Sequence, residues 1–438
     1  MCRTTPALTL ALTIPFAAAA AAQERAQVFT GATIYPIAGP PIENGALVVQ
    51  GGKIQAVGAQ GEVRAPSGAE VHDVTGKVLM PGLVDTHSHL GDVAGGDRSA
   101  ALHPEVRTLD AVDMRADNFH KALAGGITTI NVMPGSGHLM SGQTTYLKMR
   151  AGAARIEDLL FCDDPLTDVC GGMKMANGTN SQHDPQPPFP GTRGKSAALV
   201  RELFVKAQEQ GRKLEHAGDD ADKRPERDLG LEAVLEVLDG RRVVHHHTHR
   251  HDDVLTVLRL AEEFGFRPVL HHVSEAWRVA DEIAAAGAPC SIIVLDAPGG
   301  KHEAVFIRWE NGAALEKAGA DVAFHTDDAI TDSRFFLRSA GLAVRAGMSR
   351  EKALEGLTLA GARMLDLDDR LGSLEAGKDA DFILLSGDPL SVYTKVEQTW
   401  VEGAKVFDRA REEDRRYAVG GFEVYRGDMG HAHGRGGW

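Results

Sequence analysis

The sequence lacks an excess of positive charge. It has 47 lysine and arginine residues against 61 aspartate and glutamate residues, which gives a formal net charge of −14 at pH 7. An acidic surface repels phosphate backbones and anionic lipid headgroups, and no stripe rich in lysine or arginine offsets it. The composition therefore argues against a nucleic-acid or anionic-membrane partner. Beyond the N-terminus, the chain also lacks an apolar run long enough to span a bilayer.

Cysteine is scarce as well. The chain has four cysteines, and Cys2 would leave with an N-terminal signal. The odd number that remains does not indicate a disulfide framework. Cys162 and Cys170 could pair in an oxidising compartment, but a role as small buried hydrophobic residues suits them at least as well. The sequence leaves both alternatives open.

The N-terminus has the residue order of a secretory signal. A short basic start at residues 1–3 precedes an apolar stretch at 8–16 and a small-residue run at 17–22. This order predicts a signal peptide over residues 1–22, cleaved after Ala22. A retained membrane anchor is the alternative, but the apolar stretch is short for a span of about 20 residues. We therefore expect a periplasmic or secreted protein with no membrane span after cleavage.

Strand patterns at both ends of the chain surround a long middle segment. Short β-patterned runs, such as 27–34 and 396–401, lie before residue 75 and after Leu371, while apolar runs alternate with helical patterns between them. Such alternation is typical of βα units and a parallel sheet. We expect an α/β fold: a TIM-type (β/α)8 barrel over residues 79–371, and a small composite β-sandwich from residues 23–78 and 372–415.

The same patterns predict individual segments of the middle and the end of the chain. A region rich in Gly, Asp and Pro at 171–195 is predicted to be a long loop, of the kind that is functional or disordered on α/β scaffolds. Residues 416–438, which contain His431 and His433 among glycines, are predicted to form a C-terminal tail. The predicted barrel strands include 126–133, 242–247, 268–272, 290–295 and 320–326, with a helix at 252–264.

The strongest local signal is MPGLVDTHSH, which ends in His87 and His89. The two-residue period of a strand places both imidazoles on one face, and the carboxyl ends of barrel strands form the active-site mouth. Neutral imidazole is a usual zinc ligand. A bare His-x-His occurs often by chance, but the preceding Pro-Gly-Leu-Val-Asp makes this one a strong signal for a metal site.

Two later strands also end in histidine. In the tract HHHTHRH at 245–251, His247 ends the apolar run, where an inward-facing ligand belongs; a tract that binds metals loosely is the alternative. The run VLHH ends in His272, which follows His247 by 25 positions, and this interval fits one strand, one helix and two loops. A histidine satisfied in the core is the alternative for His272, and His271 is expected to face the other way.

An aspartate follows a fourth apolar strand. Asp327 ends VAFHTD, 55 residues past His272, which leaves room for two further βα units. A carboxylate at a metal can bind the ion and also carry a proton from the activated water to a leaving amine. A helix N-cap or salt-bridge role is the alternative, and it fits Asp328 better than Asp327.

With these residues in place, the sequence resembles the amidohydrolase superfamily, in its imidazolonepropionase-like and peptidase-like branch. The resemblance rests on segments 81–89, 247–250, 270–272 and 325–327, and on GSLEAGKDADFI at 372–383, which resembles that family's return into its sandwich. It covers about residues 28–407. It implies a TIM-type barrel with a composite sandwich, and hydrolysis by a metal-activated water.

The resemblance also implies the ligands. Many binuclear members carry a carboxylated lysine at the end of the fourth strand, and GMKMANG at 172–178 is similar to that strand, which nominates Lys174 as a bridge between two metals. A loop lysine, or one that binds a substrate carboxylate, is the alternative. The implied ligands of the more buried metal are His87, His89, Lys174 and Asp327, and those of the second are His247 and His272.

The resulting hypothesis is an exported amidohydrolase that cleaves a C–N bond of a dipeptide or N-acyl amino acid, with Asp327 as the proton shuttle. One or two divalent ions are expected, zinc first, although manganese and cobalt fit the same residues. Arg193 and His249 are predicted to hold a small-molecule substrate's carboxylate or the developing oxyanion; plain structural roles suit each about equally. A homo-oligomer is possible. The alternatives are a cyclic-amide or lactone hydrolase, a heterocycle deaminase, and a non-catalytic metal-binding protein.

Overall fold

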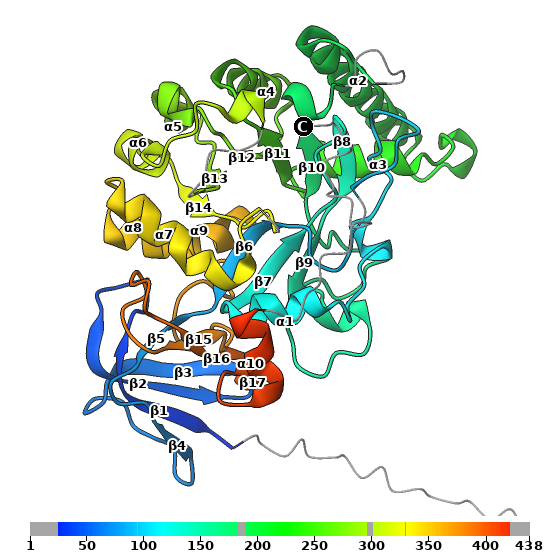
Figure 1. The fold of residues 1–438 in the computed structure, drawn as a ribbon. Helices are drawn as coiled ribbons and strands as arrows, with labels where there is room; N and C mark the ends of the chain where they lie inside the picture. The colour runs from blue at the N-terminus through cyan, green and yellow to red at the C-terminus, as the bar shows by residue number, and fades with distance from the viewer. Residues whose placement is uncertain (1–24, 94, 183–188, 296–300, 329, 421–438) are drawn as a thin grey trace, which may run out of the picture.

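The computed structural model describes residues 25–93, 95–182, 189–295, 301–328 and 330–420. The predicted signal peptide and the tail histidines His431 and His433 lie outside the described residues. Figure 1 shows a sheet built from the two ends of the chain beside a larger α/β part. Within the described ranges, no helix has the combined length and apolar character that a membrane crossing needs.

Strands from the two ends of the chain share one sheet, with the order β17-β16-β15-β5-β1-β2-β3 and with β4 paired to β1. Strand β5 joins the two ends, since it pairs in parallel with β1 and antiparallel with β15. The eight strands are β1 (Gln27–Ile34), β2 (Ile42–Gln50), β3 (Lys53–Ala59), β4 (Glu70–Asp73), β5 (Val78–Pro81), β15 (Phe382–Leu385), β16 (Val396–Val401) and β17 (Ala404–Asp408).

This sheet curls around its own apolar core. Strands β1 and β16 are three ladder steps apart, which would be roughly 14 Å in a flat sheet with about 4.8 Å between strands. Yet the rings of Phe29 on β1 and Trp400 on β16 have centroids 5.0 Å apart, and Phe382 on β15 lies 4.9 Å from Phe29. The expected two-layer sandwich is therefore one hydrogen-bonded sheet that closes over these aromatic side chains.

The middle of the chain forms the strands that carry the polar site. A six-stranded sheet has the order β14-β13-β12-β11-β10-β8, and a second sheet has the order β6-β7-β9. Neighbours from β10 to β14 are parallel, as are β6 and β7. The strands are β6 (Leu83–Ser88), β7 (Ile127–Val132), β8 (Met140–Gln143), β9 (Thr145–Lys148), β10 (Met173–Ala176), β11 (Val244–Thr248), β12 (Pro268–His272), β13 (Cys290–Ile292) and β14 (Val322–Phe324).

The prediction of eight parallel βα units is wrong at the third position. Strands β8 and β9 meet at Thr144, and both run antiparallel to their neighbours, β8 to β10 and β9 to β7. The chain reaches β9, the antiparallel neighbour of β7, through residues 133–144, which include β8 in the other sheet. At the other junction, the Asp327 N–H donates to the His87 carbonyl oxygen at 3.0 Å, so the end of β14 adjoins β6. Among the described residues, however, no continuous ladder closes the barrel.

Helices pack outside these strands, as Figure 1 shows. Two predictions of irregular structure are wrong over part of their described residues. The predicted loop at 171–195 contains β10 and the start of α2, whose N-cap Thr192 accepts a hydrogen bond from the Lys195 N–H. The predicted tail at 416–438 begins inside α10, where the Tyr417 hydroxyl donates to Asp117 at 3.1 Å. The helices are α1 (Asp117–Ala124), α2 (Arg193–Ala217), α3 (Leu229–Leu238), α4 (His251–Phe264), α5 (Ala280–Ala285), α6 (Asn311–Ala318), α7 (Phe336–Arg345), α8 (Arg350–Gly356), α9 (Leu359–Met364) and α10 (Glu412–Val419).

Cys162 and Cys170 form a disulfide, with their Cα atoms 5.1 Å apart. Of the two alternatives that the sequence leaves open, the structure has the pair. Cys290 is a free, buried cysteine on β13, where it packs as a small apolar residue.

Candidate metal centre

The two histidines at the end of β6 meet the aspartate that follows β14. The Nε2 atoms of His89 and His87 lie 3.0 Å and 3.5 Å from the Asp327 Oδ1 atom. His89 Nδ1 lies 2.8 Å from the Met133 carbonyl oxygen, which orients the ring so that its Nε2 atom is turned to the carboxylate. The structure therefore brings together three of the predicted metal ligands.

A second carboxylate, Asp85 on β6, stabilises this arrangement. It is fully buried and accepts hydrogen bonds from the Thr326 N–H at 3.0 Å and from the Thr326 hydroxyl, so it ties β6 to the residue that precedes Asp327. Burial raises the pKa of Asp85 to about 7, although the bonds from Thr326 oppose the shift. Asp85 belongs to the motif that contains His87 and His89, but no role of its own was predicted for it.

Lys174 extends from β10 into the same space. Its Nζ atom lies 3.0 Å from His87 Nε2 and 3.0 Å from the Met133 sulfur, and the side chain is fully buried. Burial lowers the pKa of Lys174 to about 7, while the charge of Asp327 raises it. The predicted bridging lysine thus lies beside a predicted ligand of the inner metal.

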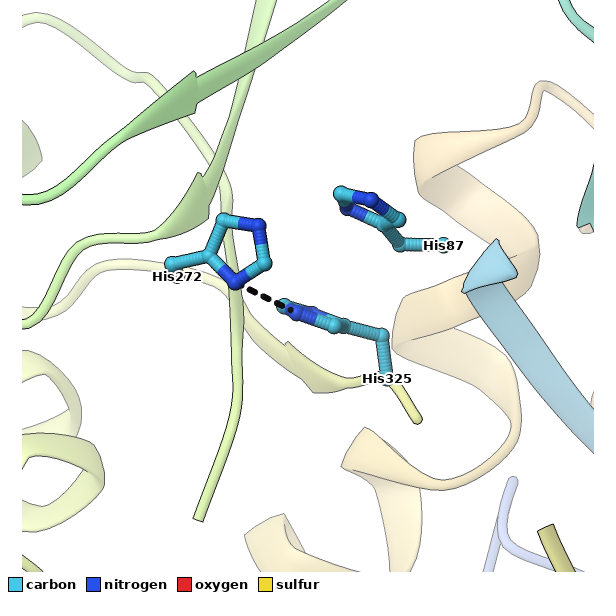
Figure 2. Close-up of side chains that lie close together, drawn as sticks. All are labelled: His87, His272 and His325. Atoms are coloured by element: carbon cyan, nitrogen blue, oxygen red, sulfur yellow. Dashed lines mark hydrogen bonds between the residues drawn. The ribbon is translucent and has the colours of Figure 1, made fainter. Parts of the chain in front are cut away.

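Histidines from β12 and from the end of β14 complete the inner group. His272 Nδ1 lies 3.1 Å from His325 Nε2, and both rings pack against His87 with centroids 4.8 Å and 4.9 Å away (Figure 2). The Ser291 hydroxyl lies 2.8 Å from the other ring nitrogen of His325. His272 Nε2 is buried and has no hydrogen-bond partner among the described residues. His325 was not predicted as a site residue, although it stands at the strand end that carries Asp327.

The expectation that His271 faces away from the interior is wrong. Its two ring nitrogens lie 3.2 Å from His87 Nδ1 and 3.0 Å from His245 Nδ1, and His245 in turn contacts the Tyr146 hydroxyl at 2.8 Å. Alternation along β12 turns His271 inward. At His272 the backbone leaves the strand conformation, with a φ of +68°. Because of this change, the His272 side chain faces inward as well.

The remaining predicted residues lie around the ends of β11 and α2. The rings of His247 and His272 are 4.3 Å apart, and those of His247 and His249 are 4.6 Å apart. The Arg193 Nε donates to both oxygens of Asp253 at 2.9 Å, and its Nη2 lies 3.5 Å from the Glu303 Oε2 atom. The guanidinium therefore already has two carboxylate neighbours, and its role as a substrate contact stays a prediction.

Burial keeps the clustered imidazoles neutral. It lowers the pKa of His325 and His245 to about 3, and it holds the pKa values of His87, His271 and His272 well below the ordinary value. Neutral imidazole is the form that binds a metal ion.

The donor set fits divalent metal ions. Three groups of buried or half-buried side chains each have ligand atoms within 4.8 Å of one another, and two of these groups contain His87. Imidazole and carboxylate together suit zinc and related first-row ions, and the buried, unpartnered Nε2 of His272 is a donor that an ion would satisfy. The groups are His87, His272 and His325; His87, His89 and Asp327; and His247, His249 and Glu303.

Comparison with known proteins gives consistent matches. The chain matches the model of the amidohydrolase family over residues 161–407. It is 27% identical to amidohydrolase tasK of Hapsidospora irregularis over 370 residues, which are 78% of this chain but only 38% of that protein. It is 25% identical to the imidazolonepropionase of Cupriavidus pinatubonensis over 394 residues, 78% of this chain and 83% of that one.

A solved structure covers a larger share of this chain than the two relatives above do. An amidohydrolase from Thermotoga maritima is 33% identical and superposes with a TM-score of 0.81, covering 87% of this chain and 100% of that chain. The similarity therefore extends beyond the segment that the family model covers.

Proposed function

The chain belongs to the amidohydrolase family, and we propose that it hydrolyses the amide bond of a dipeptide or an N-acyl amino acid. Its class, a metal-dependent hydrolase that acts on carbon–nitrogen bonds of small molecules, follows from that membership. The observation that carries the proposal is the meeting of His87, His89 and Asp327 at the ends of β6 and β14, beside a buried lysine.

We assign two divalent ions, zinc first, to this centre. The inner ion would be held by His87, His89 and Asp327, and the second by His247 and His272, with carboxylated Lys174 between them. Bound metal supplies Lewis-acid chemistry, activating a water molecule and polarising the scissile carbonyl. The position of the Lys174 Nζ atom, 3.0 Å from His87 Nε2, supports the bridging role.

The protein's own groups then handle the proton and the substrate. Asp327 accepts the proton of the attacking water and delivers it to the leaving nitrogen. The Asp85–Thr326 hydrogen bonds position the backbone next to Asp327, so we treat Asp85 as a positioning residue. His249, 6% exposed beside His247, and Arg193 are the proposed contacts for a substrate carboxylate.

Removal of metal tests the proposal directly. Protein dialysed against a chelator is expected to lose at least a hundredfold in hydrolysis rate, and added zinc is expected to restore it, because the attacking water has no other activator. Mass spectrometry of a pooled library of dipeptides, N-acyl amino acids and cyclic amides measures the products. A mock-dialysed sample is the control. Full turnover by metal-free protein would refute the mechanism, and ammonia release without a free amino acid would favour a heterocycle deaminase.

We also propose that the chain is exported and cleaved after Ala22. The Cys162–Cys170 disulfide supports export, because such bonds persist in oxidising compartments and are rare in the cytosol. N-terminal sequencing of the protein from its native host is expected to read from Gln23 in the periplasmic or secreted fraction. Protein that retains Met1, or that stays in the cytosolic fraction, would contradict this assignment.

A further inference from the structure

A carboxylate outside the predicted ligand set lies next to the outer histidines. Glu303 belongs to the short 3-10 helix His302–Ala304, in the connection between β13 and β14. It is 4% exposed, and its ligand atom lies within 4.8 Å of ligand atoms of His247 and His249, which are buried too. Unlike the other ligands, Glu303 does not follow a strand, so no strand pattern marks it.

One oxygen of Glu303 is held in place, and the other is not. Oε2 accepts a hydrogen bond from the Thr179 N–H at 2.9 Å, and Arg193 Nη2 lies 3.5 Å from it. Oε1 is buried, and within the described part of the chain it has no hydrogen-bond partner. A buried, unsatisfied carboxylate oxygen is costly, so this one calls for a partner that the described chain does not supply.

The backbone is shaped to admit this carboxylate. Gly178 has a φ of +71°, and a Cβ atom there would lie 2.6 Å from Glu303 Oε2. Any other residue at this position would push the carboxylate away and would strain the backbone. The approach of Glu303 to the outer histidines therefore depends on a glycine at the end of β10.

His249 is oriented in a way that suits a ligand. Its Nδ1 atom lies 2.8 Å from the Ser274 hydroxyl, an outer contact that fixes ring orientation in many metal sites. A ligand role therefore falls to Nε2. The ring of His272 lies close to both outer histidines, with its centroid 4.3 Å from that of His247 and 5.1 Å from that of His249, so the outer group adjoins the inner one.

We infer that the second metal ion of the proposed centre is bound by Glu303 and His249 together with His247. Two imidazoles and one glutamate form a ligand set that binds zinc and leaves a position open. The inference rests on the proposed function, because it concerns an ion of the same centre. It revises the ligand set proposed above for the outer ion, because Glu303 and His249 replace His272 there. His249 is then no longer a substrate contact, and His272 joins His87 and His325, whose ligand atoms lie within 4.8 Å of its own.

The test has two measurements. One is the metal content of the zinc-loaded protein after dialysis, and the other is the absorption spectrum of the cobalt-substituted protein. Wild type is expected to hold two equivalents and Glu303→Gln one, with at least a tenfold rise in the dissociation constant of the outer ion. The matched control is Glu275→Gln. Glu275 is equally buried, and its Oε2 atom lies 2.6 Å from His251 Nδ1, but it belongs to none of the three ligand groups. The Glu275→Gln variant is therefore expected to hold two equivalents of metal.

Two equivalents of unchanged affinity in Glu303→Gln would overturn the inference, and so would a wild type that holds a single ion. A double variant, His87→Asn with His89→Asn, separates this inference from the proposed function. It is expected to lose the inner ion and to keep the cobalt spectrum of the outer one. If wild type cleaves no amide but Glu303→Gln still loses one ion, the proposed function fails and the outer site stands.

Discussion

Asp327→Asn is expected to lower kcat by about 10³-fold, within the range of 10² to 10⁴ that a positioned general acid–base contributes. The Asp327 carboxylate lies 3.0 Å from His89 Nε2 and 3.5 Å from His87 Nε2, inside the proposed inner site. An amide of the same size cannot accept the proton of the attacking water. The backbone of Asp327 has a φ of +50°, which asparagine also tolerates, so the fold should be retained.

The neighbouring aspartate provides the matched control. Asp328 pairs with buried Lys121 at 3.1 Å and accepts the Ser333 N–H, so Asp328→Asn should lower stability more than it lowers kcat in the folded fraction. Steady-state kinetics, with thermal unfolding of both variants, separate the two effects. Near-normal turnover by Asp327→Asn would remove the proton-shuttle role, whatever its unfolding temperature.

Regular periodicity was the part of the fold that the sequence could predict. Strands β1, β12 and β16 begin and end at the predicted residues, because each is a short run with a clear change of character at both ends. The ends of β6, β12 and β14 also carry histidines or an aspartate, so parallel neighbours predict that these residues meet. His87, His89 and Asp327 do meet.

What could not be predicted depends on local departures from that periodicity. The antiparallel direction of β8 and β9 could not be predicted, because an apolar pattern does not encode strand direction. His271 and His272 both face the interior, because the backbone has a positive φ at His272 that one sequence does not reveal. Glu303 reaches the outer histidines from a connection without strand or helix periodicity, past the glycine at 178.

A buried charge cluster joins the barrel-like part to the curled sheet. Lys148 at the end of β9 is fully buried, and its Nζ atom contacts Asp379, lies 3.0 Å from Asp381 and lies 3.3 Å from Glu402. Burial raises the pKa of Asp379, but the charge of Lys148 and other cationic contacts outweigh it and lower the pKa to about 2. These three carboxylates belong to the C-terminal segments around β15 and β16, so Lys148 neutralises charge across the junction.

Lys148→Met is expected to destabilise the protein by about 3–5 kcal/mol at pH 7, the usual cost of removing one partner of a buried ion pair. Methionine fills the space but removes the cation beside buried Asp381, whereas Asp379 keeps Lys53 and Arg370, and Glu402 keeps Arg150. In wild type, the depressed pKa of Asp379 contributes stability above about pH 4 that is lost as the pH falls toward 2. Burial already raises the pKa of Asp381 in wild type, and the charge of Lys148 opposes this shift. In the variant the pKa of Asp381 should rise further, so the stability deficit should shrink between pH 7 and pH 5.

Urea unfolding at both pH values measures this deficit, and Lys53→Met is the matched control. Lys53 contacts the same Asp379 at 2.5 Å, but its side chain is 46% exposed. Exposed ion pairs contribute roughly 0–1 kcal/mol, so the control should lose little stability at either pH. Equal losses in the two variants, or a deficit in Lys148→Met that grows toward pH 5, would show that burial of unpaired carboxylates is not the cause.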